Sequence, residues 1–422
     1  MDIISFYGNI IKKNVQTNPN LSSGLIKFGL TLEEKRTRLF PDKNLPPSLQ
    51  YLNTICVKYI LEPLKNPNRS AFVNLFAPTE ILQAMKVYPL FVEGFSSFLS
   101  GLQCEETFIN IEEASGLGET LCSYHKAFLG AIESKVLPKP LFSTASSIIC
   151  DANINTFRYA ASKYNIPFYS IDIPYEYSKD AEIYVIDQLK ELIEFMEDLL
   201  GEPLNYELLK EIIDRENRSK KLLKEHYKEL KYKYFPNTLT MEMYKLFASH
   251  VSIGREETLK FYEMLLEDVK NSPNCDKNTK RIFWVHLLPF YHKTLRDYFN
   301  FSSDYQILTC DLNFDYMEEM DISNPLASLS KKMIYNQYNG MFQRKIDNIL
   351  EMYKSLNADG VINFCQWGCK QSSGGVQLLK NALAKENIPF ISIDGDGIDR
   401  RNSSSGQIKT RLEAFLEMWQ NF

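Results

Sequence analysis

The chain has 422 residues, of which 44% are hydrophobic and 24% charged, and its net charge is −5. This composition is typical of a globular protein with two or three domains, and it lacks the basic field that nucleic-acid binding requires. No apolar run is long enough to span a bilayer, and apolar residues precede the first lysines at the N-terminus, which is the wrong order for a secretory signal. We therefore predict a cytoplasmic protein without a nucleic-acid or membrane partner.

The N-terminal third of the chain changes character near residue 69. Residues 1–68 carry helical patterning interrupted by prolines, and they predict a helical N-terminal region. Residues 69–178 predict a first α/β domain, in which a helix opens at Pro78-Thr79-Glu80. Its expected strands and remaining helices are, in chain order, Ala71–Ala77, Thr107–Ile111, helix Gly118–Ile132, Leu141–Ile148, helix Asn153–Tyr164 and Ile166–Ile173.

The rest of the chain repeats the α/β texture after a long charged interval. Residues 179–278 predict helical connecting segments with solvated faces. Residues 279–422 predict a second α/β domain with a closing helix near Gln407–Trp419. Its expected strands are Arg281–Leu288, Gln306–Asp311, Gly360–Gln366 and Pro389–Asp394. The fold class is therefore α/β, with two doubly wound parallel-sheet domains of the flavodoxin or Rossmann type.

An internal repeat links the two predicted domains. Residues 165–172 read NIPFYSID and residues 387–394 read NIPFISID, so that seven of eight positions agree. Each copy follows a helix, and a cysteine precedes each helix: Cys150 in the first, and Cys365 and Cys369 in the second. We interpret this pattern as two copies of one strand–cysteine–helix–strand unit.

The position of these cysteines favours metal chemistry. Ligands bind at the carboxyl ends of the strands in doubly wound sheets, and a helix N-terminus there stabilises a thiolate. Cys150 and Cys369 are expected at such ends, and Cys122, early in its helix, is expected to face the same crevice. Three thiolates can hold an iron–sulfur cubane with one iron left open, whereas zinc or inert buried thiols are the alternatives. The tight turn at Trp367-Gly368 favours Cys369 over Cys365 as the third ligand.

Three segments resemble a known family. Residues 121–174 (LCSYHKAFLGAIES…SIICDANINTFRYAASKYNIPFYSIDIP) resemble the central signature of the D-type subunits of 2-hydroxyacyl-CoA dehydratases. Residues 359–419, from DGVINFCQWGCKQSSGG onwards, resemble their C-terminal signature, and NLFAPTEILQA near residue 74 resembles a third motif. The family also includes benzoyl-CoA reductase subunits and double-cubane cluster proteins.

The resemblance implies a function in detail. It implies an iron–sulfur lyase subunit that eliminates water from an (R)-2-hydroxyacyl-CoA through a ketyl radical, after an ATP-dependent iron–sulfur activator protein injects one electron. It implies a [4Fe-4S] cluster on Cys122, Cys150 and Cys369, or alternatively a double-cubane cluster. The expected partners are the acyl-CoA substrate, the activator, and a homologous second subunit or a second copy of this chain. A reductase-type or double-cubane member, and a non-catalytic electron-transfer or scaffold subunit, are the alternatives.

Other polar residues receive weaker predictions. Glu80, in a segment that resembles a family PxEL-type loop, is the candidate catalytic residue for substrate or proton handling, with a helix-dipole acid as the alternative. His125 is expected to hydrogen-bond near the cysteines rather than to bind metal. Arg400 and Arg401 could contact CoA phosphates, although a salt-bridged surface loop is the favoured interpretation.

Overall fold

A computed structural model describes residues 3–420 and contains two four-stranded parallel sheets within that range. The first sheet has the order β2-β1-β3-β4 and the second the order β6-β5-β7-β8. The strands are β1 (Ser70–Val73), β2 (Tyr88–Phe91), β3 (Phe142–Ser146), β4 (Phe168–Ile171), β5 (Lys280–Val285), β6 (Tyr305–Cys310), β7 (Gly360–Gln366) and β8 (Phe390–Gly395). We call residues 70–171 the first unit and residues 280–395 the second unit. The predicted α/β class with two doubly wound sheets is confirmed.

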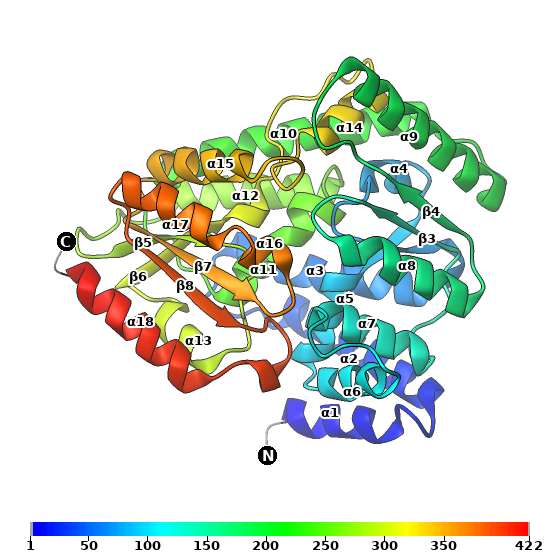
Figure 1. The fold of residues 1–422 in the computed structure, drawn as a ribbon, viewed down its shortest axis with the longest axis horizontal. Coiled ribbons are helices and arrows are strands. Elements are labelled where there is room, and N and C mark those ends of the chain that lie inside the picture. The colour runs from blue at the N-terminus through cyan, green and yellow to red at the C-terminus, as the bar shows by residue number, and fades with distance from the viewer. Residues whose placement is uncertain (1–2, 421–422) are drawn as a thin grey trace.

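Helices cross between the parallel strands and cover both sheets (Figure 1). The central strands β1, β3 and β7 are buried at every position, as expected for sheets covered on two faces. The helices of the first unit are α4 (Thr79–Ala84), α5 (Val92–Gly101), α6 (Glu105–Ala114), α7 (Ser123–Glu133) and α8 (Asp151–Tyr164). Those of the second unit are α13 (Lys293–Phe299), α14 (Pro325–Ile334), α15 (Phe342–Ser355), α16 (Lys370–Ser373) and α17 (Val376–Lys385), and α18 (Ser405–Gln420) follows its last strand.

The remaining helices precede the first unit or join the two units. The N-terminal helices are α1 (Ile3–Asn14), α2 (Pro19–Leu39) and α3 (Pro47–Lys65). The connecting helices are α9 (Lys179–Leu200), α10 (Tyr206–Leu230), α11 (Leu239–Leu246) and α12 (Glu256–Asn271), with a π-helical turn at Phe247–Val251. Figure 1 shows α9 and α10 along one edge of the molecule, with the two sheets side by side beneath them. No helix among residues 3–420 is long and apolar enough to cross a membrane.

Two predicted elements of the first unit were wrong. Thr107–Ile111 was expected to be a strand, but it lies inside helix α6, where Phe108, Ile109 and Glu112 face the interior at helical spacing. Its β-branched residues mimic a strand, while Glu105 and Glu106 in the first turn favour the helix. The missed strand is β2, whose Pro89 argues against a strand, yet β2 is an edge strand, where proline is tolerated.

The internal repeat occupies equivalent places in the two units. The copies form β4 and β8, which lie at corresponding edges of their sheets. Both begin with an asparagine in the left-handed region, Asn165 at φ 48° and Asn387 at φ 55°. Asparagine tolerates this conformation better than most residues, so that it ends the preceding helix and turns the chain into the strand.

Candidate functional site

Cys150 and Cys369 occupy the same position in their units. Cys150 follows β3 and caps the N-terminus of α8, while Cys369 follows β7 and caps α16. β3 and β7 are the third strands of two sheets with the same order. Both cysteines are free and partly buried, at the strand ends where doubly wound sheets bind ligands.

The two cysteines lie near each other across the boundary between the units. Asp151, which follows Cys150, pairs with Lys370, which follows Cys369, with Oδ2 and Nζ 3.5 Å apart. Burial, and then the neighbouring negative charge of Cys369, raise the pKa of Cys150 to about 12. The structure therefore brings together two thiols that are far apart in the sequence.

Cys122 joins this pair through a close backbone contact. A Cβ atom on Gly368, which has φ +73°, would lie 2.7 Å from the Cys122 nitrogen and 2.5 Å from the Thr120 carbonyl oxygen. Only glycine fits this approach, which seats the turn before Cys369 on the chain at Cys122. Burial raises the pKa of Cys122 well above its ordinary value, and the charges of Cys369, Asp396 and Cys150 raise it further.

The reason for the position of Cys122 differs from the prediction. It was expected early in a helix that follows a strand at Thr107–Ile111, but that strand is absent and residues 118–122 precede the helix. Cys122 instead caps α7, which begins at Ser123. The Ser123 hydroxyl donates to Asp396 Oδ1 at 2.5 Å, and Asp396 also accepts from the backbone of Ile398 and Asp399. This buried carboxylate fixes the start of α7 to the loop after β8.

A histidine contacts each of two site cysteines. His125 Nε2 lies 3.6 Å from Cys150 Sγ, and its Nδ1 lies 2.9 Å from the Thr156 hydroxyl. Burial lowers the pKa of His125 to about 4, so that its ring is neutral at physiological pH. His125 is therefore placed as a hydrogen-bonding neighbour of the site.

His286, which the sequence reasoning missed, contacts Cys369 at 3.6 Å between Nε2 and Sγ. Burial of the Cys369 thiol opposes ionisation, but the charge and hydrogen bond of His286, with hydrogen bonds from Ser372, outweigh it and lower the thiol pKa to about 6. His286 directly follows β5 and has φ 73°, a strained conformation for a non-glycine residue. Asp311 Oδ1 accepts from its backbone N–H at 2.6 Å and holds it there. Its place at the end of a strand was the signal available in the sequence.

The other cysteines have different surroundings. Cys365 lies inside β7, where its Sγ is 3.2 Å from the Ser392 hydroxyl and donates to the Ser372 carbonyl. Cys104 and Cys310 are fully buried, and the thiol of Cys56 donates to the Tyr244 carbonyl. The structure groups Cys122, Cys150 and Cys369, and it leaves these four apart.

Glu80 lies in a buried network of charges. Its Oε1 pairs with Lys332 Nζ at 2.6 Å, and the same amine pairs with Glu216 at 2.8 Å. Lys220 pairs with Glu216 at 2.9 Å, and Asp315 lies 3.4 Å from His250. A cavity of about 30 Å³ is lined by Glu80 and Lys332 on one side and by Ile148, two residues before Cys150, on another.

One carboxyl of this network holds a proton near neutrality. Burial raises the pKa of Glu80 to about 7, because Lys332 offsets only part of the desolvation and Glu216 adds to it. Burial acts on Glu216 too, but Lys220 and Lys332 outweigh it and lower its pKa to about 2. Glu216 Oε2 is buried without a hydrogen-bond partner among the described residues, and a protonated Glu80 can supply one.

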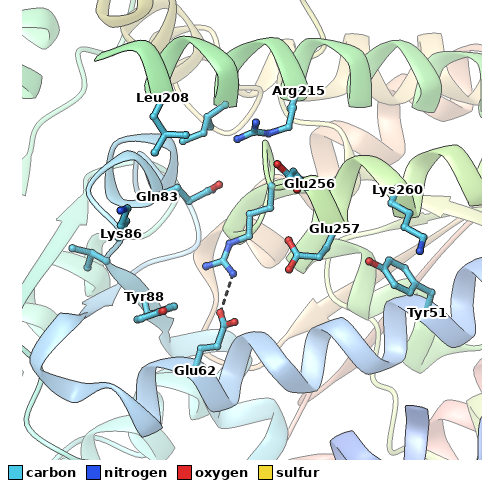
Figure 2. Close-up of a pocket in the computed structure, with 13 residues that line it drawn as sticks. Tyr51, Glu62, Gln83, Lys86, Tyr88, Leu208, Arg215, Glu256, Glu257 and Lys260 are labelled. Carbon is cyan, nitrogen blue, oxygen red and sulfur yellow. Dashed lines mark hydrogen bonds and ion pairs between the residues drawn. The ribbon is translucent and has the colours of Figure 1, made fainter. Parts of the chain in front are cut away.

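Two larger clefts lie away from the cysteines. A cleft of about 710 Å³ between α10 and α15 contains Phe314, Tyr316 and Met317, and it shares Asp315 with the small cavity near Glu80. A cleft of about 600 Å³ lies between α3, α10 and α12 (Figure 2). Its cations are satisfied within the protein, since Arg255 pairs with Glu62 at 2.9 Å and Arg215 donates to the Gly254 carbonyl at 2.6 Å.

Arg400 and Arg401 bind the first unit. Arg400 forms an ion pair with Glu105 and donates to the Ser100 carbonyl at 3.1 Å. Arg401 pairs with Glu113 at 3.0 Å and with Asp399 at 2.8 Å. These contacts agree with the favoured interpretation of a salt-bridged loop.

The three grouped cysteines suit a cluster better than a single ion. Among residues 3–420, no three His, Cys, Asp or Glu side chains converge on one point, as a mononuclear site requires. Thiolates that bind a cubane surround a body of several atoms and stand farther apart. The donor set fits such a group because all three donors are thiols at helix N-termini, beside two imidazoles.

These observations define a class: two-unit α/β proteins whose equivalent strand ends converge on a thiol site. The family model of the 2-hydroxyglutaryl-CoA dehydratase D-component matches residues 74–419. The chain therefore belongs to this family.

Curated relatives match most of the chain. It is 24% identical over 368 residues to the (R)-phenyllactyl-CoA dehydratase alpha subunit of Clostridium sporogenes, covering 81% of this chain and 87% of the relative. It is 23% identical over 385 residues to the lactoyl-CoA dehydratase subunit alpha of Anaerotignum propionicum, covering 82% and 89%. It is 21% identical over 342 residues to a benzoyl-CoA reductase subunit of Thauera aromatica, covering 72% and 78%.

Proposed function

We propose that this chain is the iron–sulfur subunit of an (R)-2-hydroxyacyl-CoA dehydratase, a lyase of anaerobic metabolism that acts in the cytoplasm. Family membership and the names of two relatives support the reaction class. The observation that carries the proposal is the meeting of Cys150 and Cys369, from equivalent strand ends, beside Cys122. The subunit designations of the relatives support a homologous partner chain or a second copy.

In this proposal Cys122, Cys150 and Cys369 hold a [4Fe-4S] cluster. When bound, such a group supplies one-electron chemistry and an open Lewis-acidic position. An ATP-dependent activator protein provides the electron, and the acyl-CoA thioester reacts through a ketyl radical. His125 and His286 orient and electrostatically support the thiolates of Cys150 and Cys369, as hydrogen-bonding neighbours of metal ligands commonly do.

Glu80 is the proposed proton carrier of the reaction. Loss of a 2-hydroxyl group as water requires a proton donor, and a carboxyl with a pKa of about 7 is protonated often enough at neutral pH to serve. Lys332 and Glu216 hold Glu80 in position and set its protonation. The small cavity between Glu80 and Ile148 is the shortest described route from this acid towards Cys150.

Iron analysis of anaerobically purified variants tests the ligand set. Cys122→Ser, Cys150→Ser and Cys369→Ser are each expected to lose most of their iron, because three thiolates are the minimum for a stable cubane with one open position. Cys365→Ser is the matched control, since its thiol contacts Ser392 and Ser372 within the second unit, and it is expected to keep full iron. Full iron in any of the first three removes that residue from the ligand set.

The iron content of the wild type separates the related functions. About four iron atoms per chain support the [4Fe-4S] proposal, and about eight favour a double-cubane cluster. A colourless protein would favour a non-catalytic scaffold. The relative from benzoyl-CoA reductase makes a reductase the second candidate. Anaerobic assays with 2-hydroxyacyl-CoA and aromatic acyl-CoA substrates, activator and ATP distinguish elimination from reduction.

A further inference from the structure

Helix α2 has two apolar faces, and only one of them packs on the protein. Ser22, Ile26, Leu30 and Thr37 are buried against the rest of the chain. At 100° per residue, Leu21, Phe28, Leu32 and Leu39 fall within a sector of about 40° on a different side of the helix, roughly opposite the buried face. These four side chains, which we call the α2 stripe, are exposed by 45, 56, 50 and 63%.

The α2 stripe is larger than isolated surface leucines would produce. It extends over about 27 Å of the helix, at 1.5 Å per residue. Phe40, directly after α2, is exposed by 72%, and neighbouring α1 also exposes Ile3 and Phe6. Together these side chains exceed the few hundred Å² of contiguous apolar surface that a monomer commonly shows, and such surfaces mark interaction sites.

The spacing of the stripe fits a two-fold axis. When two copies of α2 run antiparallel with residue 30 at the axis, position i faces position 60 − i of the other copy. Leu21 then faces Leu39, and Phe28 faces Leu32, so that every member of the stripe meets another member. At the same register Lys27 stands level with Glu33 of the second copy, and no two like charges stand at the same level.

We propose that the α2 stripe binds the α2 stripe of a second copy of this chain, in an antiparallel, two-fold symmetric contact. A self-complementary patch is the requirement for such an isologous interface. Both helices that form the surface precede residue 74, where the family match begins, so the contact lies outside the thiol site. The inference does not depend on the proposed function, and iron content and association are measured separately.

Sedimentation velocity of the full-length protein over a range of micromolar concentrations tests the contact. The wild type is expected to be a dimer, and Leu32→Glu a folded monomer with association weakened by roughly 100-fold, because the substitution places a charge at the centre twice. The matched control is Leu378→Glu, since Leu378 in α17 is exposed by 57% but lies outside the stripe. A monomeric wild type, or a Leu32→Glu dimer with native circular dichroism, overturns the proposal.

Mixing two variants tests the register. Phe28→Glu and Leu32→Lys are each expected to be monomeric, and their mixture is expected to form a heterodimer. In the antiparallel register the glutamate introduced at position 28 of one variant faces the lysine introduced at position 32 of the other, and the second Phe–Leu contact stays intact. A parallel pairing leaves both charges against apolar side chains and predicts no recovery. Absence of a heterodimer, or a wild-type monomer that binds anionic lipid vesicles through the stripe instead, also overturns the proposal.

Discussion

Cys150 and Cys369 hold the same place in their units and yet differ in acidity. The pKa of Cys150 is raised to about 12, mainly by burial, and its histidine neighbour is neutral because burial lowers the pKa of His125 to about 4. Cys369 faces a similar burial, but the charge and hydrogen bond of His286 lower its pKa to about 6. Since the thiolate is the form that binds metal, Cys369 is the thiol that is ready for iron at neutral pH.

The protonation of Glu80 predicts a pH-dependent stability. Its pKa is about 7 in the folded protein and 4.5 ordinarily, so the folded state binds the proton more tightly. The resulting stabilisation is complete below pH 4.5 and is lost as the pH rises through 7. Glu80→Gln imitates the protonated form, so its free energy of unfolding should improve relative to the wild type between pH 5 and pH 8. A gain on the order of 3 kcal/mol is expected in urea titrations.

The control for this experiment is Glu176→Gln, because Glu176 is exposed. Its stability relative to the wild type should stay constant over the same range. The partner Glu216, with a pKa lowered to about 2, completes its titration below this range and does not obscure the result. A difference between wild type and Glu80→Gln that is independent of pH would contradict a protonated Glu80.

At the scale of elements, the turn from β7 to α16 joins the two units. Trp367 donates from its indole nitrogen to the Glu119 carbonyl at 3.3 Å, and Gly368 lies against Thr120 and Cys122. The turn thus carries Cys369 and also seats it beside Cys122. A side chain at position 368 would push the two segments apart.

Gly368→Ala is therefore expected to destabilise the protein and to reduce its iron content. The added Cβ clashes with backbone atoms at 2.5 and 2.7 Å, and alanine is strained at φ +73°. We expect a loss of about 2–4 kcal/mol in the free energy of unfolding. Gly101→Ala is the control, because a Cβ there has no neighbour within 4 Å, and its effect should stay within about 0.5 kcal/mol. Equal effects of the two substitutions would show that the close approach at Gly368 is unimportant.

Elements with strong local signals could be predicted from the sequence, and those set by tertiary context could not. The repeated NIPF segments and β7 were placed correctly because their apolar runs and turn residues agree with the fold. The helix at α6 was mistaken for a strand because its β-branched residues alternate, and β2 was missed because of Pro89. In each case burial against neighbours decided the structure.

The same distinction applies to the candidate site. The three cysteines could be proposed from their place beside repeated strands and from a family resemblance. His286, Lys332 and Glu216 could not, because they reach their partners across 83, 252 and 136 positions of the chain. No local pattern records a contact of that kind, and Glu80 alone gave no sign that its carboxyl is paired within a buried network.

At the scale of the whole molecule, the proposed cluster would bind the two units to each other. Two of its thiols come from the first unit and one from the second, so iron binds only the assembled fold. Removal of iron by a chelator under anaerobic conditions should lower the thermal midpoint, by about 5 °C or more, because a ligand specific for the folded state stabilises it. Differential scanning calorimetry measures the shift.

The matched control is Cys150→Ser, which should hold little iron and whose midpoint should not respond to the chelator. Cys365→Ser should respond like the wild type, because its thiol lies outside the grouped set. A chelator that lowers the midpoints of wild type and Cys150→Ser equally would show that the stabilisation does not come from iron at these thiols.

The division of the thiols between the units restricts how the molecule can move. A hinge between the units would pull Cys369 away from Cys122 and Cys150, so a bound cluster would act as a clasp against opening. Substrate exchange must then proceed while the scaffold stays closed, by rotation of side chains at the rim. Trp367, half exposed and anchored through a single indole hydrogen bond next to Cys369, is the largest side chain placed to swing aside.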